Sequence, residues 1–299
     1  MKHSKLSIVI LSYNTKELLR NCLNSLREVR GEVDFEVIVC DNGSTDGSVE
    51  MLERHFDWIK KIVKTGKNVG FAAGNNIALK NLETEFALLL NPDTTVYPNT
   101  LKTVLEYVIK NKGVGAATCR VELPNGALDY SCHRGFPTPW NAFCYFSGLA
   151  KIFPRSKTFS GYTASFKNFD EIHEIDALTG AFALIRVKAA KQVEWLDEDY
   201  FWNGEDIDFC YKLKERGWKI IYIPHVKITH FKGSASGLRS SAATKPAKSV
   251  KKRAALSSTQ VMRLFYKKHL SQKYPFFLNR LVYLGINLLE TFRVTKHSI

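Results

Sequence analysis

Short apolar segments alternate with segments of helical spacing over the first 120 residues, and this alternation constrains the fold most strongly. Apolar runs rich in aliphatic and β-branched residues occur at 6–12, 35–40, 60–64, 86–90 and 114–119. Helical spacing is found between them, at 16–28, about 47–55, 74–82 and 98–111. Strands that are apolar on both faces and separated by helices predict an α/β fold, in which helices flank a mainly parallel central sheet.

Three of these predicted strands end in polar or acidic residues. The first is followed by Tyr13, the second by the sequence DNGSTDGS, which begins at Asp41, and the fourth by Asn91-Pro92-Asp93. In an open α/β sheet, ligands bind beyond the carboxyl ends of the strands. We therefore expect Asp41 and Asp93 to lie at a binding crevice.

Two interpretations are open for each of these acids. Both sequences are also typical of turns, so Asp41 and Asp93 could be turn residues only. Alternatively, Asp93 could bind Mg²⁺ or Mn²⁺ together with a diphosphate, because hard cations prefer carboxylate and phosphate oxygens. Asp41 is placed to accept hydrogen bonds from a nucleotide base or ribose, whereas Asp46 suits the cap of the next helix.

A second acidic group begins a predicted helix at 204–217, which we expect to end at Gly217. Acids in a first turn are favoured by the helix dipole alone, which is one explanation for them. The other is catalysis, with one acid as a general base. Asp206 and Asp208 would lie about 200° apart around the helix, so only one of them can face a given site.

The predicted strand at 218–224 leads to two histidines, His225 and His230. A single histidine is either a structural residue or a metal ligand, and the sequence pattern does not choose between the two. Residues 174–186 also have strand character, whereas 120–175 are rich in aromatic residues, Pro and Gly, and predict irregular structure.

Positive charge is concentrated at the C-terminal end. Residues 232–299 contain fourteen Lys and Arg and one acid, Glu290, so they carry +13 of the total charge of +14. We expect a flexible basic linker or loop at 232–253 and a basic amphipathic helical tail at 254–299. Such a tail suits an anionic membrane surface, although packing on the body with a solvated basic face is the alternative.

Other patterns narrow the class of protein. No aromatic-interleaved recognition motif accompanies the basic segment, so we expect no nucleic-acid binding. The glycine-rich signatures of dinucleotide-binding and P-loop enzymes are missing as well. The first apolar run is too short for a signal-peptide core, and no apolar run is long enough to span a membrane. Six scattered cysteines without a Cys-x-x-Cys pair are typical of a reducing, cytoplasmic compartment.

Seven segments together resemble the family 2 glycosyltransferases of the GT-A fold, in particular their rhamnosyltransferase-like branch. In sequence order these are SIVILSYNT, VIVCDNGSTDGS, NVGFAAGNN, LLLNPDTTV, TGAFALIR, FWNGEDIDFCYKLKERGW and THFKGSAS. They extend from residue 6 to about 236. The resemblance implies a glycosyltransferase domain at 1–231, with a nucleotide-binding half at 1–119 and an acceptor and catalytic half at 120–231.

The resemblance also implies a role for each matching residue. Asp206 would be the general base of an inverting reaction. Asp93 would be the main ligand of Mg²⁺ or Mn²⁺, in a motif whose first acid is replaced by asparagine, and His230 would complete the metal site. The donor site would be formed by Tyr13, Asp41, Asn68, Gly70 and Asn91.

The implied activity is transfer of a sugar, with rhamnose a candidate, from a dTDP- or UDP-sugar to a saccharide or polyprenyl-linked glycan. This would occur in cell-surface polysaccharide synthesis, by a cytoplasmic enzyme peripheral to the inner face of the cell membrane. One alternative is a sugar-nucleotide nucleotidyltransferase, which would be expected to have a glycine-rich loop where this chain has LSYNTKELL. Another is a non-catalytic carbohydrate- or membrane-binding module. The sequence leaves the donor sugar, the acceptor and the oligomeric state open.

Overall fold

The structure is a computed structural model that describes residues 5–232 and 248–298. It consists of two compact units, and each is described by itself. The first is formed by the described residues of Met1–Phe201 and Glu205–Phe231, and the second by those of Trp202–Gly204 and Lys232–Ile299.

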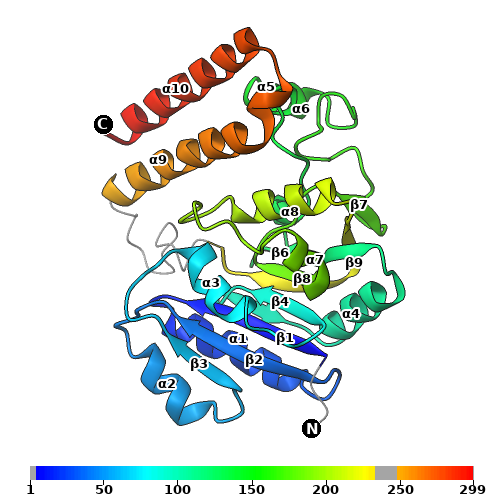
Figure 1. Cartoon of the computed structure of the whole chain (residues 1–299), viewed down its shortest axis with the longest axis vertical. Helices are drawn as coiled ribbons and strands as arrows, with labels where there is room; N and C mark the ends of the chain where they lie inside the picture. Colours follow the sequence, from blue (N-terminus) through cyan, green and yellow to red (C-terminus); the bar gives the residue numbers. More distant parts are fainter. Residues whose placement is uncertain (1–4, 233–247, 299) are drawn as a thin grey trace. The chain divides into compact units, whose positions relative to one another are not determined.

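Four parallel strands form the first half of a sheet in the first unit (Figure 1), in the order β3-β2-β1-β4. These strands are β1 (Leu6–Ser12), β2 (Phe35–Asp41), β3 (Lys61–Lys64) and β4 (Phe86–Leu90). The helices that connect them are α1 (Lys16–Glu28), α2 (Ser48–His55) and α3 (Phe71–Leu79). Every residue of β1 and β4 is buried, which explains why the sequence shows continuous apolar runs there.

The sheet continues beyond β4 with mixed directions, in the order β4-β8-β6-β9-β5, and β7 pairs with β9. β8 is antiparallel to both β4 and β6, whereas β6 and β9 are parallel to each other. The strands of this half are β5 (Thr94–Val96), β6 (Val114–Glu122), β7 (His173–Ile175), β8 (Phe182–Arg186) and β9 (Lys219–His230). The helices are α4 (Thr100–Lys110), α7 (Val187–Gln192) and α8 (Glu205–Glu215).

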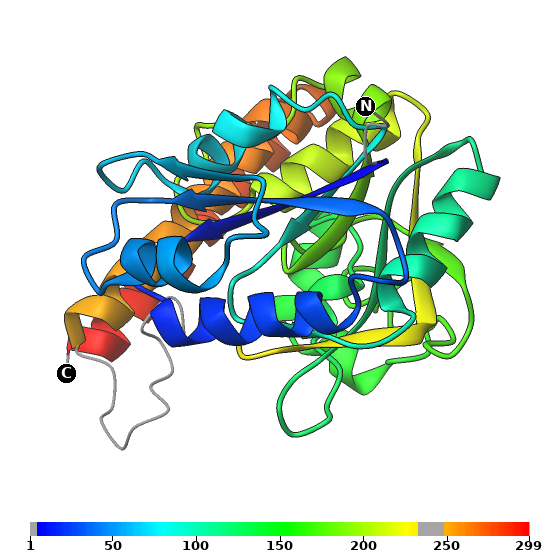
Figure 2. The same ribbon diagram turned by 90° about the horizontal axis from the view of Figure 1, so that it is seen from below.

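Helices cover both faces of the sheet. Figure 2 shows α1 and α2 on one face of the first strands and α3 on the opposite face. Leu19, Leu23 and Leu26 of α1 are fully buried, and they recur at helical spacing toward the strands. The predicted α/β architecture, with a central sheet between helices, is therefore confirmed. The sheet is less parallel than predicted, because four of its strand pairs are parallel and four are antiparallel.

Several local predictions were inaccurate, among them the strand expected at 218–224, which as β9 continues to His230. α3 begins three residues before the predicted start, because Gly70 takes a φ of +92° and allows the chain to turn into the helix immediately. The stretch 120–175 is less irregular than expected, because it contains η1 (Tyr130–Cys132), α5 (Pro139–Phe146) and α6 (Leu149–Ile152). Thr138 caps α5 by accepting a hydrogen bond from the Asn141 N–H at 3.2 Å.

The second unit contains a helical hairpin. Its helices are α9 (Lys248–Phe265) and α10 (Phe276–Ser298), joined by the π-helical turn η2 (Tyr266–Leu270) and the 3₁₀ turn η3 (Ser271–Lys273). Much of the predicted linker at 232–253 lies outside the described residues, and α9 begins within it, at Lys248. Among the helices that the structure describes, none is long and apolar enough to cross a membrane.

Candidate active site

Asp41 lies at the carboxyl end of β2 and is buried. Its Oδ2 atom accepts hydrogen bonds from the N–H groups of Gly43 at 3.2 Å and Ser44 at 3.0 Å. The Oδ1 atom is also buried, yet it has no hydrogen-bond partner among the described residues. A buried carboxylate oxygen without a donor is unfavourable, so this atom is suited to accept a hydrogen bond from a ligand hydroxyl or amide.

Asn42 organises the loop before α3, and the sequence analysis did not single it out. Its Nδ2 donates to Asn68 Oδ1 at 3.1 Å, and its Oδ1 accepts from the Val69 N–H at 3.0 Å. Asn68 Oδ1 also accepts from the Gly70 N–H at 3.0 Å. The structure thus places Asn68 as a residue that shapes the loop, and its direct contact with a nucleotide stays a prediction.

Gly70 lies where the chain permits no side chain. A Cβ atom at residue 70 would lie 2.9 Å from the backbone oxygen of Phe201 and 2.9 Å from the Cδ2 atom of the Phe201 ring. Phe71 donates its N–H to the same backbone oxygen at 2.8 Å. The start of α3 and the segment ending at Phe201 therefore approach each other closely because residue 70 is glycine.

The loop after β1 is joined to the loop after β2. The Asn14 N–H donates to Ser44 Oγ at 3.0 Å, and Asn14 Oδ1 accepts from the Thr45 N–H at 2.8 Å. Asn14 has a φ of +52°, a left-handed conformation that asparagine tolerates better than most residues. Tyr13, which precedes it, is 40% exposed, so its ring is accessible to a ligand.

Asp46 accepts hydrogen bonds at the starts of two helices, although the N-cap residue of α2 is Gly47 and not Asp46 as predicted. Its two carboxylate oxygens accept hydrogen bonds from the N–H groups of Lys16 at 2.9 Å and Ser48 at 3.0 Å, at the starts of α1 and α2. Burial by itself would raise the pKa of Asp46, but the hydrogen bonds to its carboxylate outweigh burial and lower the pKa.

Asp93 and His230 are brought together by the pairing of β5 with β9, in which Thr94 lies opposite His230. Asp93 Oδ1 lies 3.3 Å from His230 Nε2, and both side chains are almost completely buried. Asn91 Nδ2 lies 3.4 Å from the same nitrogen. His225 is exposed, so the structure distinguishes the two histidines that the sequence left as alternatives.

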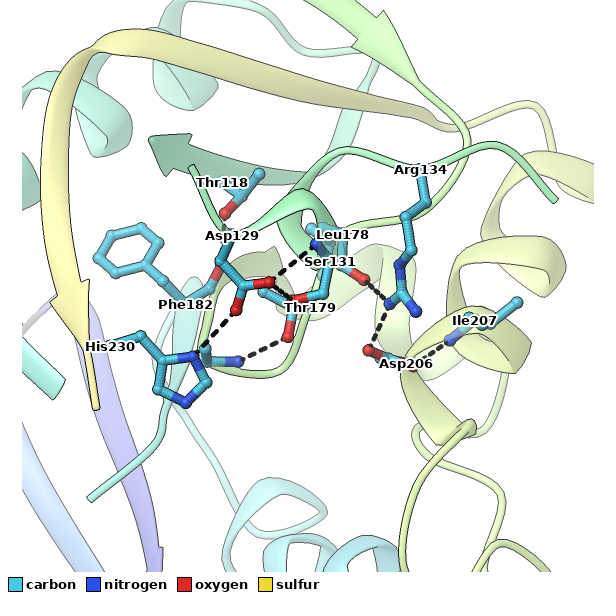
Figure 3. A network of polar contacts seen from close by, with 11 residues as sticks. Thr118, Asp129, Ser131, Arg134, Leu178, Thr179, Phe182, Asp206, Ile207 and His230 are labelled. Atoms are coloured by element: carbon cyan, nitrogen blue, oxygen red, sulfur yellow. Dashed lines mark hydrogen bonds and ion pairs between the residues drawn. The ribbon is translucent and has the colours of Figure 1, made fainter. Parts of the chain in front are cut away.

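Asp129 contacts His230 from the other side, and the sequence analysis missed it (Figure 3). His230 Nδ1 lies within hydrogen-bond distance of Asp129 Oδ2, at 3.3 Å. Asp129 Oδ1 accepts hydrogen bonds from the Ser131 N–H at 3.0 Å and its hydroxyl at 2.8 Å. Burial alone would lower the pKa of His230, but Asp129 and Asp93 outweigh this effect and raise it to about 9.

These residues fit one divalent cation. The buried Asp93 Oδ1 makes no hydrogen bond of good geometry with any described residue, and it lies beside the imidazole Nε2 of His230. Asp129 lies against the other ring nitrogen, which is the usual arrangement behind a metal-binding histidine. No group of three or more His, Cys, Asp or Glu side chains within the described ranges could hold a metal, so the remaining ligands would come from elsewhere.

Asp206 lies in the first turn of α8 and is fixed by Arg134 (Figure 3). Arg134 Nη2 donates to Asp206 Oδ2 at 2.7 Å and to the Leu178 backbone oxygen at 2.9 Å. Burial would lower the pKa of Arg134, but the charge and hydrogen bond of Asp206, together with other nearby groups, outweigh burial and raise it. Arg134 therefore remains charged, and its guanidinium holds the Asp206 carboxylate in one orientation.

The neighbouring acids of α8 have other environments. Glu205 is buried, and this burial, followed by the charge of Asp206, raises the pKa of Glu205 to about 8. Asp208 is fully buried and pairs with Lys212 at 3.1 Å. The expectation that Asp206 and Asp208 face different surroundings is thus confirmed.

The chain matches a known protein family over more than half of its length. The family model described as "Glycosyl transferase family 2" matches residues 7–193, more than half of the chain. The chain belongs to this family. It is therefore a glycosyltransferase, and the resemblance inferred from its sequence motifs is confirmed. Asp206 and His230 lie beyond the matched residues, so their roles in this glycosyltransferase stay predictions.

Individual relatives agree with the assignment. The chain is 25% identical over 243 residues to the N-acetylglucosaminyl-diphospho-decaprenol L-rhamnosyltransferase of Mycobacterium tuberculosis (strain CDC 1551 / Oshkosh), an alignment that covers 78% of each protein. It is 26% identical over 234 residues to the rhamnosyltransferase WbbL of Escherichia coli (strain K12), covering 75% of this chain and 82% of WbbL. The glycosyltransferase is thus similar to rhamnosyltransferases.

A solved structure supports the fold. The mannosyltransferase PcManGT from Pyrobaculum calidifontis, in complex with GDP-Man and Mn²⁺, has a TM-score of 0.59 to this chain at 16% identity. The match covers 100% of this chain and 74% of PcManGT. The predicted GT-A fold is therefore confirmed.

Proposed function

We propose that this glycosyltransferase transfers a sugar, with rhamnose the first candidate, from a dTDP- or UDP-sugar to a hydroxyl group of a saccharide or polyprenyl-linked glycan. Two similar proteins are named as rhamnosyltransferases, and the name of one contains a decaprenol-linked diphosphate sugar. The decaprenol-linked sugar in that name supports a polyprenyl-linked acceptor. We assign the enzyme to cell-surface polysaccharide synthesis at the cytoplasmic face of the cell membrane.

The observation that carries the proposal is that two buried carboxylate oxygens beyond strand ends make no hydrogen bond of good geometry with any described residue. They are Asp41 Oδ1, at the end of β2, and Asp93 Oδ1, just after β4. Both acids follow parallel strands of an open sheet, which is where ligands bind in such folds. A nucleoside diphosphate offers hydroxyl and amide donors for the first oxygen and a cation-bound diphosphate for the second.

The donor is assigned to the loops that follow β1, β2 and β4. Asp41 accepts a hydrogen bond from the base or ribose, and the exposed ring of Tyr13 lies next to the base. The loop of Asn68 and Gly70 closes one side of this site, and Asn91 lies toward the diphosphate. Each of these residues acts by binding and orienting the nucleotide.

Asp93 and His230 would hold Mg²⁺ or Mn²⁺, and this ion, when bound, neutralises charge that develops on the departing diphosphate. Asp129 would position His230 by accepting a hydrogen bond from Nδ1, and Nε2, which faces Asp93, would bind the ion after giving up its proton. The solved mannosyltransferase of the same fold, which contains Mn²⁺, supports this choice of ion.

Asp206 is the proposed general base. Its carboxylate accepts the proton of the acceptor hydroxyl while the oxygen of that hydroxyl forms a bond with the anomeric carbon. The bond between this carbon and the diphosphate oxygen breaks on the opposite side, so the anomeric configuration is inverted. Arg134 stays charged and keeps Asp206 oriented throughout.

A calorimetric titration tests the donor site. UDP and dTDP would be titrated into the wild-type chain and the Asp93→Ala variant, each with and without Mn²⁺ or Mg²⁺. We expect metal-dependent binding of one nucleotide by the wild type, loss of that binding in Asp93→Ala, and no change in the exposed control Asp57→Ala. The absence of nucleotide binding by folded wild-type protein would contradict the donor site, and unchanged binding in Asp93→Ala would contradict the metal site.

The transfer reaction needs a second experiment. Sugars linked to the nucleotide that binds would be incubated with polyprenyl-diphosphate-linked saccharides, and the product's anomeric configuration would be determined by NMR. An inverted product with a rhamnose donor agrees with the full proposal. A retained configuration would contradict the single displacement assisted by Asp206.

A further inference from the structure

One face of α10 carries exposed apolar side chains at regular helical spacing. They are Phe277, Leu281, Leu284, Leu288 and Phe292, which we call the α10 stripe, and each is between 54% and 67% exposed. Residues that recur every three or four positions lie on the same side of an α-helix. The stripe is therefore continuous along most of this 23-residue helix.

The opposite face of α10 contacts α9. Glu290 Oε2 receives hydrogen bonds from Arg263 Nη1 at 2.5 Å and from Thr259 Oγ1 at 2.6 Å. Asn287 Oδ1 receives a further bond from Arg263 Nη2 at 2.7 Å. Glu290 lies about half a turn around the helix from the stripe, so the contacts between the helices leave the stripe facing outward.

The connection between the helices is also fixed. Tyr266 donates its hydroxyl to Asn279 Oδ1 at 2.5 Å, and Asn279 Nδ2 donates to the Ser271 backbone oxygen at 2.9 Å. The Tyr266 ring packs edge-on against the Tyr283 ring, with 5.6 Å between the two ring centroids. Hydrogen bonds therefore fix both the turn and the face of α10 that contacts α9. The α10 stripe is thus held in one orientation within the hairpin.

An apolar surface of this extent marks a site of contact with a partner or a membrane. Charge indicates which of the two applies. In the hairpin, the described side chains include six Lys and Arg against a single acid, Glu290, which is already paired with Arg263. The basic residues are Arg263, Lys267, Lys268, Lys273, Arg280 and Arg293.

A second copy of the chain would bring together two hairpins that each carry an excess of positive charge, which costs free energy through repulsion. Anionic lipid headgroups complement the same charge, and acyl chains cover the apolar side chains. Arg280, whose guanidinium lies 4.5 Å above the Phe276 ring, stands at the edge of the stripe, where its charge can reach headgroups.

We propose that the α10 stripe binds the surface of an anionic lipid bilayer, with the helix lying in the plane of the membrane. The apolar residues occupy one face only, so the helix is suited to the interface rather than to the bilayer interior. This inference adds a membrane-contact surface to the proposed function, and its test requires no enzymatic activity.

The test uses the full chain and sedimentation with vesicles of phosphatidylcholine, with or without phosphatidylglycerol. We expect the wild type to bind the anionic vesicles and the Leu284→Gln/Leu288→Gln variant to bind them about tenfold or more weakly. The control Ile77→Gln/Ile109→Gln, which alters exposed apolar residues of the first unit, should bind like the wild type. In a separate variant, Leu288→Trp, the added tryptophan should give a fluorescence component, absent from the wild type, that shifts to shorter wavelength when anionic vesicles are added.

Three results would overturn the proposal: no binding of wild type to anionic vesicles, equal binding by the stripe variant, or fluorescence of the Leu288→Trp variant that vesicles leave unchanged. Concentration-dependent dimerisation that is lost in the stripe variant, without any vesicle binding, would assign the stripe to a second copy and overturn it as well. Failure of the proposed function has a different signature. Neither wild type nor stripe variant would then transfer sugar to a short water-soluble acceptor, whatever the vesicles show.

Discussion

The candidate site contains two carboxylates with opposite surroundings. Asp93 shares a histidine with a second acid: His230 lies 3.3 Å from Asp93 on one side and 3.3 Å from Asp129 on the other. Asp206 instead faces the guanidinium of Arg134 at 2.7 Å, and the acid next to it, Glu205, has a pKa raised to about 8. One centre therefore has an excess of negative charge, and the other is close to balanced at neutral pH.

This difference agrees with the two proposed roles. A site for a divalent cation gains from two nearby carboxylates, because the ion supplies the missing positive charge. A general base must be ionised when the acceptor binds and must then take up a proton. One fixed cation, Arg134, and one neutral neighbour, Glu205, permit both. Because the two centres share none of these side chains, a substitution in one should leave the function of the other intact.

Asp206→Asn should affect the chemical step alone. We expect kcat to fall by about 10²- to 10⁴-fold, because the amide cannot accept the proton of the acceptor hydroxyl. Metal-dependent nucleotide binding should stay at the wild-type level, since the donor residues are unchanged. Transfer assays combined with calorimetry measure both quantities, and a parallel loss of nucleotide binding would contradict the separation of the two centres.

Asp129→Ala should lower the affinity for the metal ion, although Asp129 is not among the proposed nucleotide-binding residues. We expect Mn²⁺ affinity, measured by electron paramagnetic resonance with UDP or dTDP present, to fall by about 10- to 100-fold, because His230 loses the partner of its Nδ1. Asp129→Asn should restore part of this affinity. Ser131→Ala is the matched control, as it removes a bond to the other oxygen of Asp129. If Asp129 is only structural, Asp129→Ala will lower the melting temperature and leave Mn²⁺ affinity unchanged.

Arg134 should influence the rate of transfer through the orientation of the base. In Arg134→Met, we expect a roughly tenfold lower kcat, because the Asp206 carboxylate loses the guanidinium that holds it in one orientation. Arg134→Lys keeps the charge and should recover part of this rate in the same transfer assay. An identical kcat in all three proteins would show that Arg134 does not position the base.

The residues of these centres were not equally predictable from the sequence. Asp41 and Asp93 were identified because each follows a buried strand that ends, whereas Asp206 was chosen among the acids of a predicted helix start only through the resemblance to family 2 glycosyltransferases. The periods of strands and helices depend on neighbouring residues only, so the buried strands β1, β2 and β4 were predicted within about one residue.

Asp129 and Arg134 were missed because their contacts depend on the order of strands in the sheet. Asp129 bonds with His230 across 101 residues, and Arg134 bonds with Asp206 across 72 residues. Both lie in the stretch that the sequence analysis described as irregular, where no period indicates which side chains turn inward. The helix α5 in that stretch did have a local signal, Thr138 before Pro139, which the many aromatic residues obscured.

Glu205→Gln should give the smallest effect, a change in how stability depends on pH. The pKa of Glu205 is raised from its ordinary value of 4.5 to about 8 in the folded chain, so the folded chain holds this proton more tightly than the unfolded chain. The stability that Glu205 contributes is thus complete below about pH 4.5 and is lost as the pH rises through about 8. Urea unfolding between about pH 5 and pH 9 should show a falling free energy of unfolding for the wild type relative to Glu205→Gln. Parallel curves for the two proteins would mean that Glu205 is ionised in the folded state, and the balanced charge assigned to the Asp206 centre would then be wrong.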